Sequence, residues 1–202
     1  LIEGARRVGK SYLAEEFAKK EYDSYILIDF NRASSQVKDL FENGLDDLDT
    51  FFLKLSASYN TSLVPRRSLI ILDEVQLFPR ARSAVKYLVA DGRFDYVETG
   101  SLVSIRKNVK DILIPSEEES IKMYPMDLEE FCWALGNETL MPFVADCFEG
   151  RRPLGQALHR KAMDVFRQYL IVGGMPQAVA RYVESRDFKA VDAVKRRILK
   201  LY

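Results

Sequence analysis

The sequence contains no long hydrophobic run and no excess of one charge. Its longest uninterrupted apolar stretch is Phe131–Leu135, whereas a membrane-spanning helix needs about 20 apolar residues. We therefore expect neither a helical membrane span nor a membrane as a partner. The 30 Lys and Arg residues balance 30 Asp and Glu residues. This balance excludes the simplest kind of basic nucleic-acid-binding protein, although it is compatible with local basic patches.

Cysteine is scarce, because Cys132 and Cys147 are the only two and no His/Cys cluster surrounds them. Such a pattern argues against a disulfide framework and against a zinc site. The sequence also lacks a signal-peptide pattern, so we expect a cytoplasmic protein with two reduced, buried thiols. It opens at Leu1 without an initiator Met, and we expect the protein to extend beyond both ends of this chain.

Hydrophobic periodicity divides the chain into an α/β part, residues 1–125, and a helical part, residues 126–202. In the first part, short apolar runs alternate with amphipathic stretches, which is typical of a parallel sheet with crossover helices. The first of its strands is expected to be truncated. We predict strands at Leu1–Glu3, Tyr25–Phe30, Leu69–Leu72, Tyr96–Thr99 and Ile121–Tyr124, and helices at Lys10–Lys20, Asp39–Tyr59 and Ala81–Ala90.

The helical part begins after Pro125. Asp127 is expected to cap a short helix that carries Trp133 into the core. Two longer amphipathic helices are predicted at Gln156–Val172 and Phe188–Leu201, because their apolar residues fall on one helical face.

The strongest functional signal is the segment Gly4–Ser11, which reads GARRVGKS and matches the pattern G-x-x-x-x-G-K-[ST]. It follows a predicted strand and precedes a predicted helix, as this phosphate-binding motif requires. The glycines let backbone amides approach phosphate oxygens, the lysine reaches the β- and γ-phosphates, and the serine hydroxyl is placed to bind Mg²⁺. The predicted nucleotide-binding residues are Gly4, Ala5, Arg6, Arg7, Val8, Gly9, Lys10, Ser11 and Tyr12.

A second signal is the acidic pair Asp73 and Glu74 at the end of the apolar run Leu69–Leu72. In doubly wound folds, the carboxyl end of such a strand lies beside the phosphate loop. We predict that Asp73 supports Mg²⁺ together with Ser11, and that Glu74 orients or deprotonates the attacking water. A pair of helix-capping acids in a turn is the alternative interpretation.

Small polar residues end a third apolar run, Tyr96–Thr99. A hydroxyl there, with Ser101 as the first candidate and Thr99 as the second, would contact the γ-phosphate or the attacking water. A plain strand-to-loop turn explains the same residues. Gln76 follows the acidic pair closely enough to line the same site. We take Lys10, Glu74 and Ser101 as the predicted catalytic residues.

Missing motifs narrow the nucleotide and the reaction. No Asn-Lys-x-Asp or Asp-x-x-Gly sequence occurs, so the guanine-reading and switch elements of GTPases are absent and ATP is expected. The leading hypothesis is a Mg²⁺-dependent ATPase that hydrolyses ATP to ADP and phosphate to drive a conformational change. One alternative is a nucleotide-gated binding module with little turnover, and another is a metabolite kinase.

Five segments carry a family resemblance: GARRVGKS, IILDEVQLFP, ETGS, MYPMDLEEF and YLIVGGMP. Across essentially the whole chain they resemble the bacterial and archaeal AAA+-type P-loop ATPases with a C-terminal domain of unknown function. The resemblance implies an ATPase core over residues 1–125, followed over residues 126–202 by a helical lid and the start of the C-terminal domain. It also implies ATP and Mg²⁺ as cofactors.

One departure from the family concerns the residues before the YP strand, where members often carry Gly-Arg. Residues 114–119 of this chain read IPSEEE instead, so no arginine finger is placed there. Arg6 and Arg7 lie in variable positions of the phosphate loop, where we expect them to face solvent. Arg181 is a further candidate.

The balanced total charge conceals two segments of opposite sign. Residues 116–149 contain nine acidic residues and one basic residue, whereas residues 150–202 contain twelve basic and four acidic residues. The basic C-terminal helices are candidates for binding a nucleic acid or protein partner, or for docking on the acidic stretch, which we favour. A homo-oligomer is compatible with the sequence.

Overall fold

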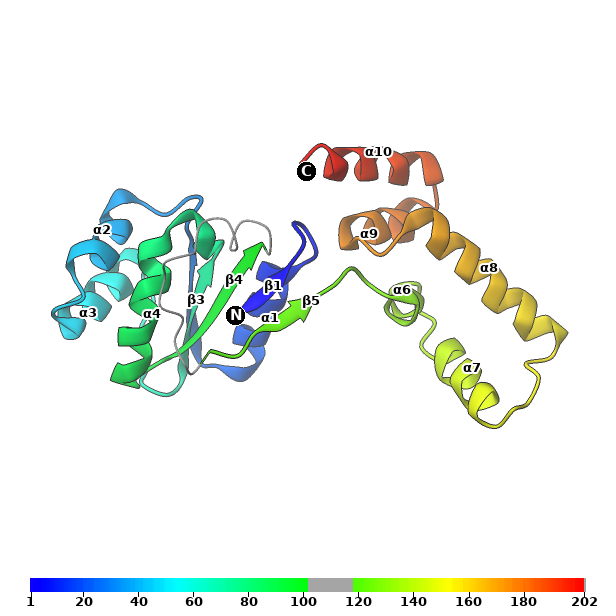
Figure 1. Ribbon diagram of the computed structural model, residues 1–202, viewed down its shortest axis with the longest axis horizontal. Helices are drawn as coiled ribbons and strands as arrows, with labels where there is room; N and C mark the ends of the chain where they lie inside the picture. The colour runs from blue at the N-terminus through cyan, green and yellow to red at the C-terminus, as the bar shows by residue number, and fades with distance from the viewer. Residues whose placement is uncertain (102–117, 202) are drawn as a thin grey trace. The chain divides into compact units, whose positions relative to one another are not determined.

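The computed structural model describes residues 1–101 and 118–201 of the chain (Figure 1). It divides into two compact units, Leu1–Met123 and Tyr124–Tyr202. Within the described residues, no helix combines the length and the apolar character needed to cross a membrane.

The first unit is built on a parallel sheet in which the strands lie in the order β2-β3-β4-β1-β5. The predicted α/β fold with a parallel sheet is therefore confirmed, and each predicted strand is present with small changes at its ends. The strands are β1 (Ile2–Gly4), β2 (Ser24–Asp29), β3 (Ser68–Asp73), β4 (Asp95–Ser101) and β5 (Ile121–Met123).

Side chains of the central strands alternate between two hydrophobic layers. Ile70 and Leu72 of β3 belong to the layer formed with α2, α3 and α4, whereas Leu69 and Ile71 pack with α1. Burial on both faces explains why β3 is apolar without interruption. The helices of this unit are α1 (Lys10–Glu21), α2 (Ser35–Asn43), α3 (Leu48–Tyr59) and α4 (Pro79–Asp91), with a short 3₁₀ turn at Val75–Leu77.

The predicted continuous helix Asp39–Tyr59 is wrong, because two helices occupy this region. Helix α2 ends at Gly44, a residue type that weakens a helix interior by about 1 kcal/mol relative to alanine. Asp47 then caps α3, since its carboxylate accepts a hydrogen bond of 3.1 Å from the amide of Thr50. A glycine followed by a capping acid thus ends one helix and starts another.

The second unit is helical and has its own core. Its elements are α6 (Leu128–Ala134), α7 (Leu140–Glu149), α8 (Gln156–Val172), α9 (Pro176–Ser185) and α10 (Phe188–Leu199). The buried centre comprises Phe131, Val172, Ala178, Val179, Tyr182 and Val191. Both cysteines lie in this unit and are buried, free thiols.

The start of α6 follows the prediction at one residue and departs from it at another. Asp127 caps the helix in a reciprocal capping box with Glu130. Trp133, predicted to lie in the core, is instead half exposed. Residues two positions apart on a helix point about 200° away from each other, so the complete burial of Phe131 turns Trp133 outward.

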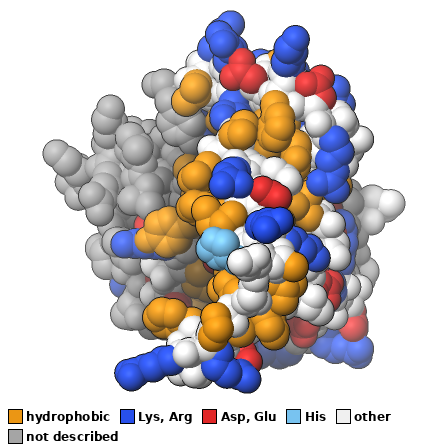
Figure 2. All heavy atoms as spheres, turned by 90° about the vertical axis from the view of Figure 1, so that its right-hand side faces the viewer, with side chains coloured by type: hydrophobic (Ala, Val, Ile, Leu, Met, Phe, Trp, Pro, Cys, Tyr) orange, Lys and Arg blue, Asp and Glu red, His pale blue; other side chains and the backbone are white. Residues whose placement is uncertain are grey.

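Helix α8 exposes much of its surface in the second unit. Val172 is its only buried residue among those described, whereas Leu170 and Ile171 are both half exposed or more. Figure 2 shows hydrophobic side chains interspersed with Lys and Arg over one face of this unit.

Candidate functional site

The phosphate-loop motif connects the end of β1 to the start of α1, as its sequence context predicts. Gly9 is the N-cap of α1 and adopts φ 104°, a left-handed conformation that glycine reaches without strain. Glycine has no side chain that could cap a helix. Gly9 therefore leaves the first amides of α1 without a capping side chain. Such a helix terminus attracts anions, phosphate in particular.

Gly4 is required by the close approach of two neighbouring strands. It pairs in register with Ser101 of β4 on one side and with Met123 of β5 on the other. A Cβ atom at this position would lie 2.3 Å from the carbonyl oxygen of Met123 and 3.3 Å from Val8. The backbone carbonyl cannot move aside as a flexible side chain could, so the loop begins where only glycine fits.

Lys10 folds back over the loop that precedes it. Its Nζ donates hydrogen bonds to the carbonyl oxygens of Gly4 (3.2 Å) and Ala5 (2.9 Å), and the residue is only 4% exposed. Burial lowers the pKa of Lys10, whereas the charges of Glu74 and Asp73 act in the opposite direction. A lysine held at this place by two neutral carbonyls is available to exchange them for phosphate oxygens.

Ser11 and Asp73 meet at the carboxyl end of the sheet. The Ser11 hydroxyl donates a hydrogen bond of 2.6 Å to Oδ1 of Asp73. The same carboxylate oxygen accepts a hydrogen bond from the hydroxyl of Thr99 on the neighbouring strand β4. Two hydroxyls from different elements thus hold Asp73, which is itself buried.

Glu74 follows β3 in a left-handed conformation, with φ 57° and ψ 45°. This region costs a residue with a side chain about 1 kcal/mol or more. Two contacts hold it there: its amide donates to the Thr99 hydroxyl (3.2 Å) and its carboxylate accepts a hydrogen bond from Gln76. Asp73 thus ends β3, and Glu74 begins the 3₁₀ turn that follows it.

The other predicted site residues lie at the same edge but differ in exposure. Ser101 is 6% exposed and pairs with Gly4. Val8 is fully buried, and Tyr12 is 71% exposed at the first turn of α1. Ala5, Arg6 and Arg7 are exposed, and Arg7 adopts φ 62°.

The acidic segment at residues 114–119 is described only in part, because residues 114–117 lie outside the described residues. Glu118, which is described, contacts Arg82 of α4. Its carboxylate accepts hydrogen bonds of 3.0 and 2.9 Å from Nη2 of Arg82, whose Nη1 contacts Glu98.

Two features of this region go beyond what the sequence predicts. Thr99 was the second candidate after Ser101, although its hydroxyl contacts both acidic residues. The buried group of Arg82, Glu98 and Glu118 was not predicted. A charged residue inside the otherwise apolar run Tyr96–Thr99 was the available signal, since an unpaired carboxylate is costly to bury.

Comparison with known proteins identifies a family for this chain. A family model described as an AAA domain matches residues 1–132. No curated protein matches the chain. Among solved structures, PCH-2 of C. elegans aligns with a TM-score of 0.47 and 12% identity, over 98% of this chain and 60% of the PCH-2 chain; this chain thus spans less than two thirds of that protein. The family model matches more than half of the residues of this chain. The chain therefore belongs to the AAA domain family and contains a nucleotide-binding ATPase module.

Proposed function

We propose that the chain binds ATP with Mg²⁺ and hydrolyses it to ADP and phosphate. In this proposal, residues 1–125 form the ATPase core, and residues 126–202 form a helical lid and the beginning of a further domain. Membership of the AAA domain family supports nucleotide binding. The reaction, the metal and the role of each residue are inferred from the arrangement of side chains.

The observation that carries the proposal is the contact between Ser11 and Asp73, 2.6 Å from hydroxyl to carboxylate. A hydroxyl and a carboxylate are oxygen ligands of the kind that Mg²⁺ prefers. They lie at the amino end of α1, where phosphate would also bind. The residues therefore fit a Mg²⁺ ion: Ser11 would bind it directly and Asp73 would support its coordination shell. Bound there, Mg²⁺ would neutralise charge that develops on the phosphates.

The loop and Lys10 would bind the triphosphate. Backbone amides between Gly4 and Ser11 would donate to phosphate oxygens, and Lys10 would leave the carbonyls of Gly4 and Ala5 to contact the β- and γ-phosphates. The lowered pKa of Lys10 reflects its burial, and a phosphate would compensate that cost by supplying negative charge.

Glu74 would act on the attacking water. Its carboxylate lies one residue beyond Asp73, and Gln76 donates a hydrogen bond to it. A carboxylate fixed in this way can orient a water molecule and accept its proton. Ser101, at the end of β4 beside Gly4, would contact the γ-phosphate. Catalysis would then consist of positioning and electrostatic stabilisation.

Phosphate release by the full-length protein tests this function. We expect steady release from ATP in the presence of Mg²⁺ and none above background with a chelator of divalent cations. Binding of a fluorescent ATP analogue, measured in parallel, separates loss of turnover from loss of binding. An absence of Mg²⁺-dependent release from a protein that binds ATP would refute the hydrolase proposal.

The second candidate is a nucleotide-gated binding module with little turnover. The observation that favours it is the basic end of α10, where Arg196 and Arg197 occupy the last turn and Lys200 follows. Such a helix end suits a polyanion, including nucleic acid, or an acidic protein surface. Binding of ATP that changes affinity for duplex DNA without phosphate release would support this function over the first.

A further inference from the structure

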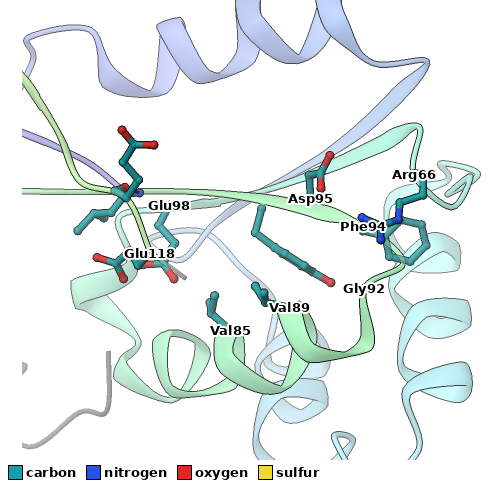
Figure 3. A pocket seen from close by; sticks show the side chains of 11 residues that line it. Arg66, Val85, Val89, Gly92, Phe94, Asp95, Glu98 and Glu118 are labelled. Carbon is teal, nitrogen blue, oxygen red and sulfur yellow. Dashed lines mark hydrogen bonds between the residues drawn. The ribbon is translucent and has the colours of Figure 1, made fainter. Parts of the chain in front are cut away.

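A cavity of about 320 Å³ lies between β4 and α4, away from the phosphate loop. Val85 and Val89 of α4 form one wall, Phe94 lies at one end, and Glu98 and Glu118 lie at the other (Figure 3). Each of these side chains comes from the described part of the chain. A cavity of this size can hold a small organic molecule or one long side chain.

The polar end of the cavity contains an unbalanced group of buried charges. Arg82 is 2% exposed, Glu98 is 4% exposed and Glu118 is 10% exposed, each measured on the side chain. Arg82 contacts both carboxylates. One guanidinium therefore faces two carboxylates. The α-ammonium of Leu1 and the carboxylate of Glu119 also line the cavity, so two positive groups stand against three negative ones, a net charge of −1. A buried charge that lacks a counter-charge is strongly destabilising.

In the described part of the chain, the carboxylate of Glu98 is hydrogen-bonded at only one of its two oxygens. Oε2 of its carboxylate bonds to Arg82, whereas Oε1 is buried and has no hydrogen-bond partner among the described residues. Glu98 also lines the cavity. A buried carboxylate oxygen beside an open space points to a donor that occupies the space.

Other lining residues indicate what the donor would be. Val85, Val89 and the ring of Phe94 offer apolar contact, and Asp95 and Glu119 add negative charge at the rim. In the described part of the chain, no three acidic, histidine or cysteine side chains are grouped so as to hold a metal ion. A cationic head with an aliphatic stem matches these walls better than a metal ion does.

We propose that this cavity is a binding site for an organic monocation, a primary ammonium or guanidinium group on a short aliphatic chain. The cation donates to Oε1 of Glu98 and brings the buried charges to balance, while its stem packs on Val85 and Val89. Arg66 at the opposite end of the cavity disfavours a second positive charge, so a dication binds less well. A free amine and a lysine or arginine side chain share this chemistry.

The position of Glu98 on β4 separates this site from the phosphate loop. Tyr96 belongs to the layer with α4, and Val97 belongs to the layer with α1. Because side chains alternate along a strand, Glu98 faces the cavity while Thr99 faces Asp73. The cation site therefore does not depend on ATP hydrolysis, and its failure would leave the proposed ATPase function intact.

A proton and the organic cation compete for the carboxylate of Glu98. Burial raises the pKa of Glu98 to about 7, while Arg82 and the α-ammonium of Leu1 act in the opposite direction and Glu118 adds to the rise. A cation needs the ionised carboxylate. Its affinity should therefore increase as the pH rises through 7.

The test is a titration of the full-length protein with n-butylammonium and with n-butylguanidinium at pH 8. Calorimetry and ligand-detected NMR measure the binding. Neutral n-butanol is the matched ligand control. Glu98→Gln removes the charge with little change of shape, Val89→Phe fills the cavity and keeps the charge, and Glu42→Gln on α2 is the control for an exposed acid. Circular dichroism establishes that each variant is folded.

We expect saturable binding of both cations to the wild type and to Glu42→Gln, and no saturable binding of n-butanol. Affinity should fall by about tenfold or more in Glu98→Gln and in Val89→Phe. If only one of these variants folds, that variant decides. An absence of saturable binding to the wild type, or unchanged binding to the folded cavity variants, would overturn the proposal.

A competition experiment with a peptide distinguishes the two sources of the cation. A short peptide with one lysine, acetylated at its amino terminus, is titrated against bound n-butylammonium. Competition would support a side chain of a partner segment as the ligand, whereas binding of n-butylammonium without competition would support a free amine.

Discussion

Ser11 and Asp73 lie 62 residues apart in the chain, and the Ser11 hydroxyl donates a hydrogen bond of 2.6 Å to the Asp73 carboxylate. The contact joins the first turn of α1 to the carboxyl end of β3. It therefore holds two oxygen-bearing side chains together at the edge of the sheet where the segment Gly4–Ser11 also ends.

Ser11→Ala should weaken the effect of Mg²⁺ on nucleotide binding. We expect Mg²⁺ to increase the affinity of the wild type for ATP, and this increase to shrink by roughly tenfold in the variant because one oxygen ligand is lost. Titration of a fluorescent ATP analogue with Mg²⁺ and with a chelator measures the effect. Ser58→Ala, an exposed serine on α3, is the control. Equal Mg²⁺ dependence in Ser11→Ala and the wild type would exclude the proposed metal ligand.

Lys10→Ala should weaken nucleotide binding whether or not Mg²⁺ is present. Loss of a charge-assisted contact to phosphate should lower the affinity by about ten- to a hundredfold. The same titration checks this, with Lys20→Ala near the other end of α1 as a matched lysine control. An effect of equal size in both variants would show that general charge, and not contact by Lys10, supports binding.

Thr99→Val should reduce turnover more than nucleotide affinity. The Thr99 hydroxyl donates to Asp73 and accepts from the Glu74 amide, so valine would release both acidic residues from their positions. Small displacements of reacting groups lower the reaction rate by up to about a hundredfold. We expect kcat to fall by roughly tenfold or more with KM nearly unchanged, and Thr99→Ser to restore most of the activity. If serine rescued nothing, a positioning role for the hydroxyl would be ruled out.

Glu98 should make the protein less stable as the pH rises from about 4.5 to about 7. Burial raises its pKa from 4.5 to about 7 in the folded state, so the folded protein holds a proton that the unfolded chain has lost. The stabilisation from this proton is complete below pH 4.5 and is lost by pH 7, at up to about 1.4 kcal/mol per pH unit. Urea unfolding at several pH values measures it.

Glu98→Gln is the comparison for that pH series, because glutamine does not titrate. The difference in unfolding free energy between Glu98→Gln and the wild type should grow in favour of glutamine as the pH rises through this range. A difference that stays constant between pH 5 and pH 7 would show that the pKa of Glu98 is not raised.

The sheet was predictable because its strands are short apolar runs bounded by turn residues. Leu69–Leu72 is buried on both faces, and that requirement is visible in the sequence as an uninterrupted apolar run. The break between α2 and α3 was missed because Phe51 and Phe52 continue the apolar pattern of the preceding helix, while the capping contact of Asp47 depends on one side-chain hydrogen bond.

The phosphate-loop motif and its place between β1 and α1 were predictable because the motif is local, with all its residues inside one octet. The pairing of Thr99 with Asp73 depends instead on the register of two strands, β3 and β4, which a single sequence does not specify. The same holds for Glu98 and Arg82, whose contact joins a strand to a helix. Charged residues that become buried partners are apparent only when both elements are in place.

Single-turnover hydrolysis by Glu74→Gln tests the proposed function most directly. Glutamine keeps the shape of the side chain and can still bond to Gln76, but it cannot accept a proton from water. We expect the full-length variant to bind ATP with Mg²⁺ as the wild type does and to release phosphate at least about a hundredfold more slowly. Unchanged phosphate release by this variant would contradict the role of Glu74 and the reaction built on it.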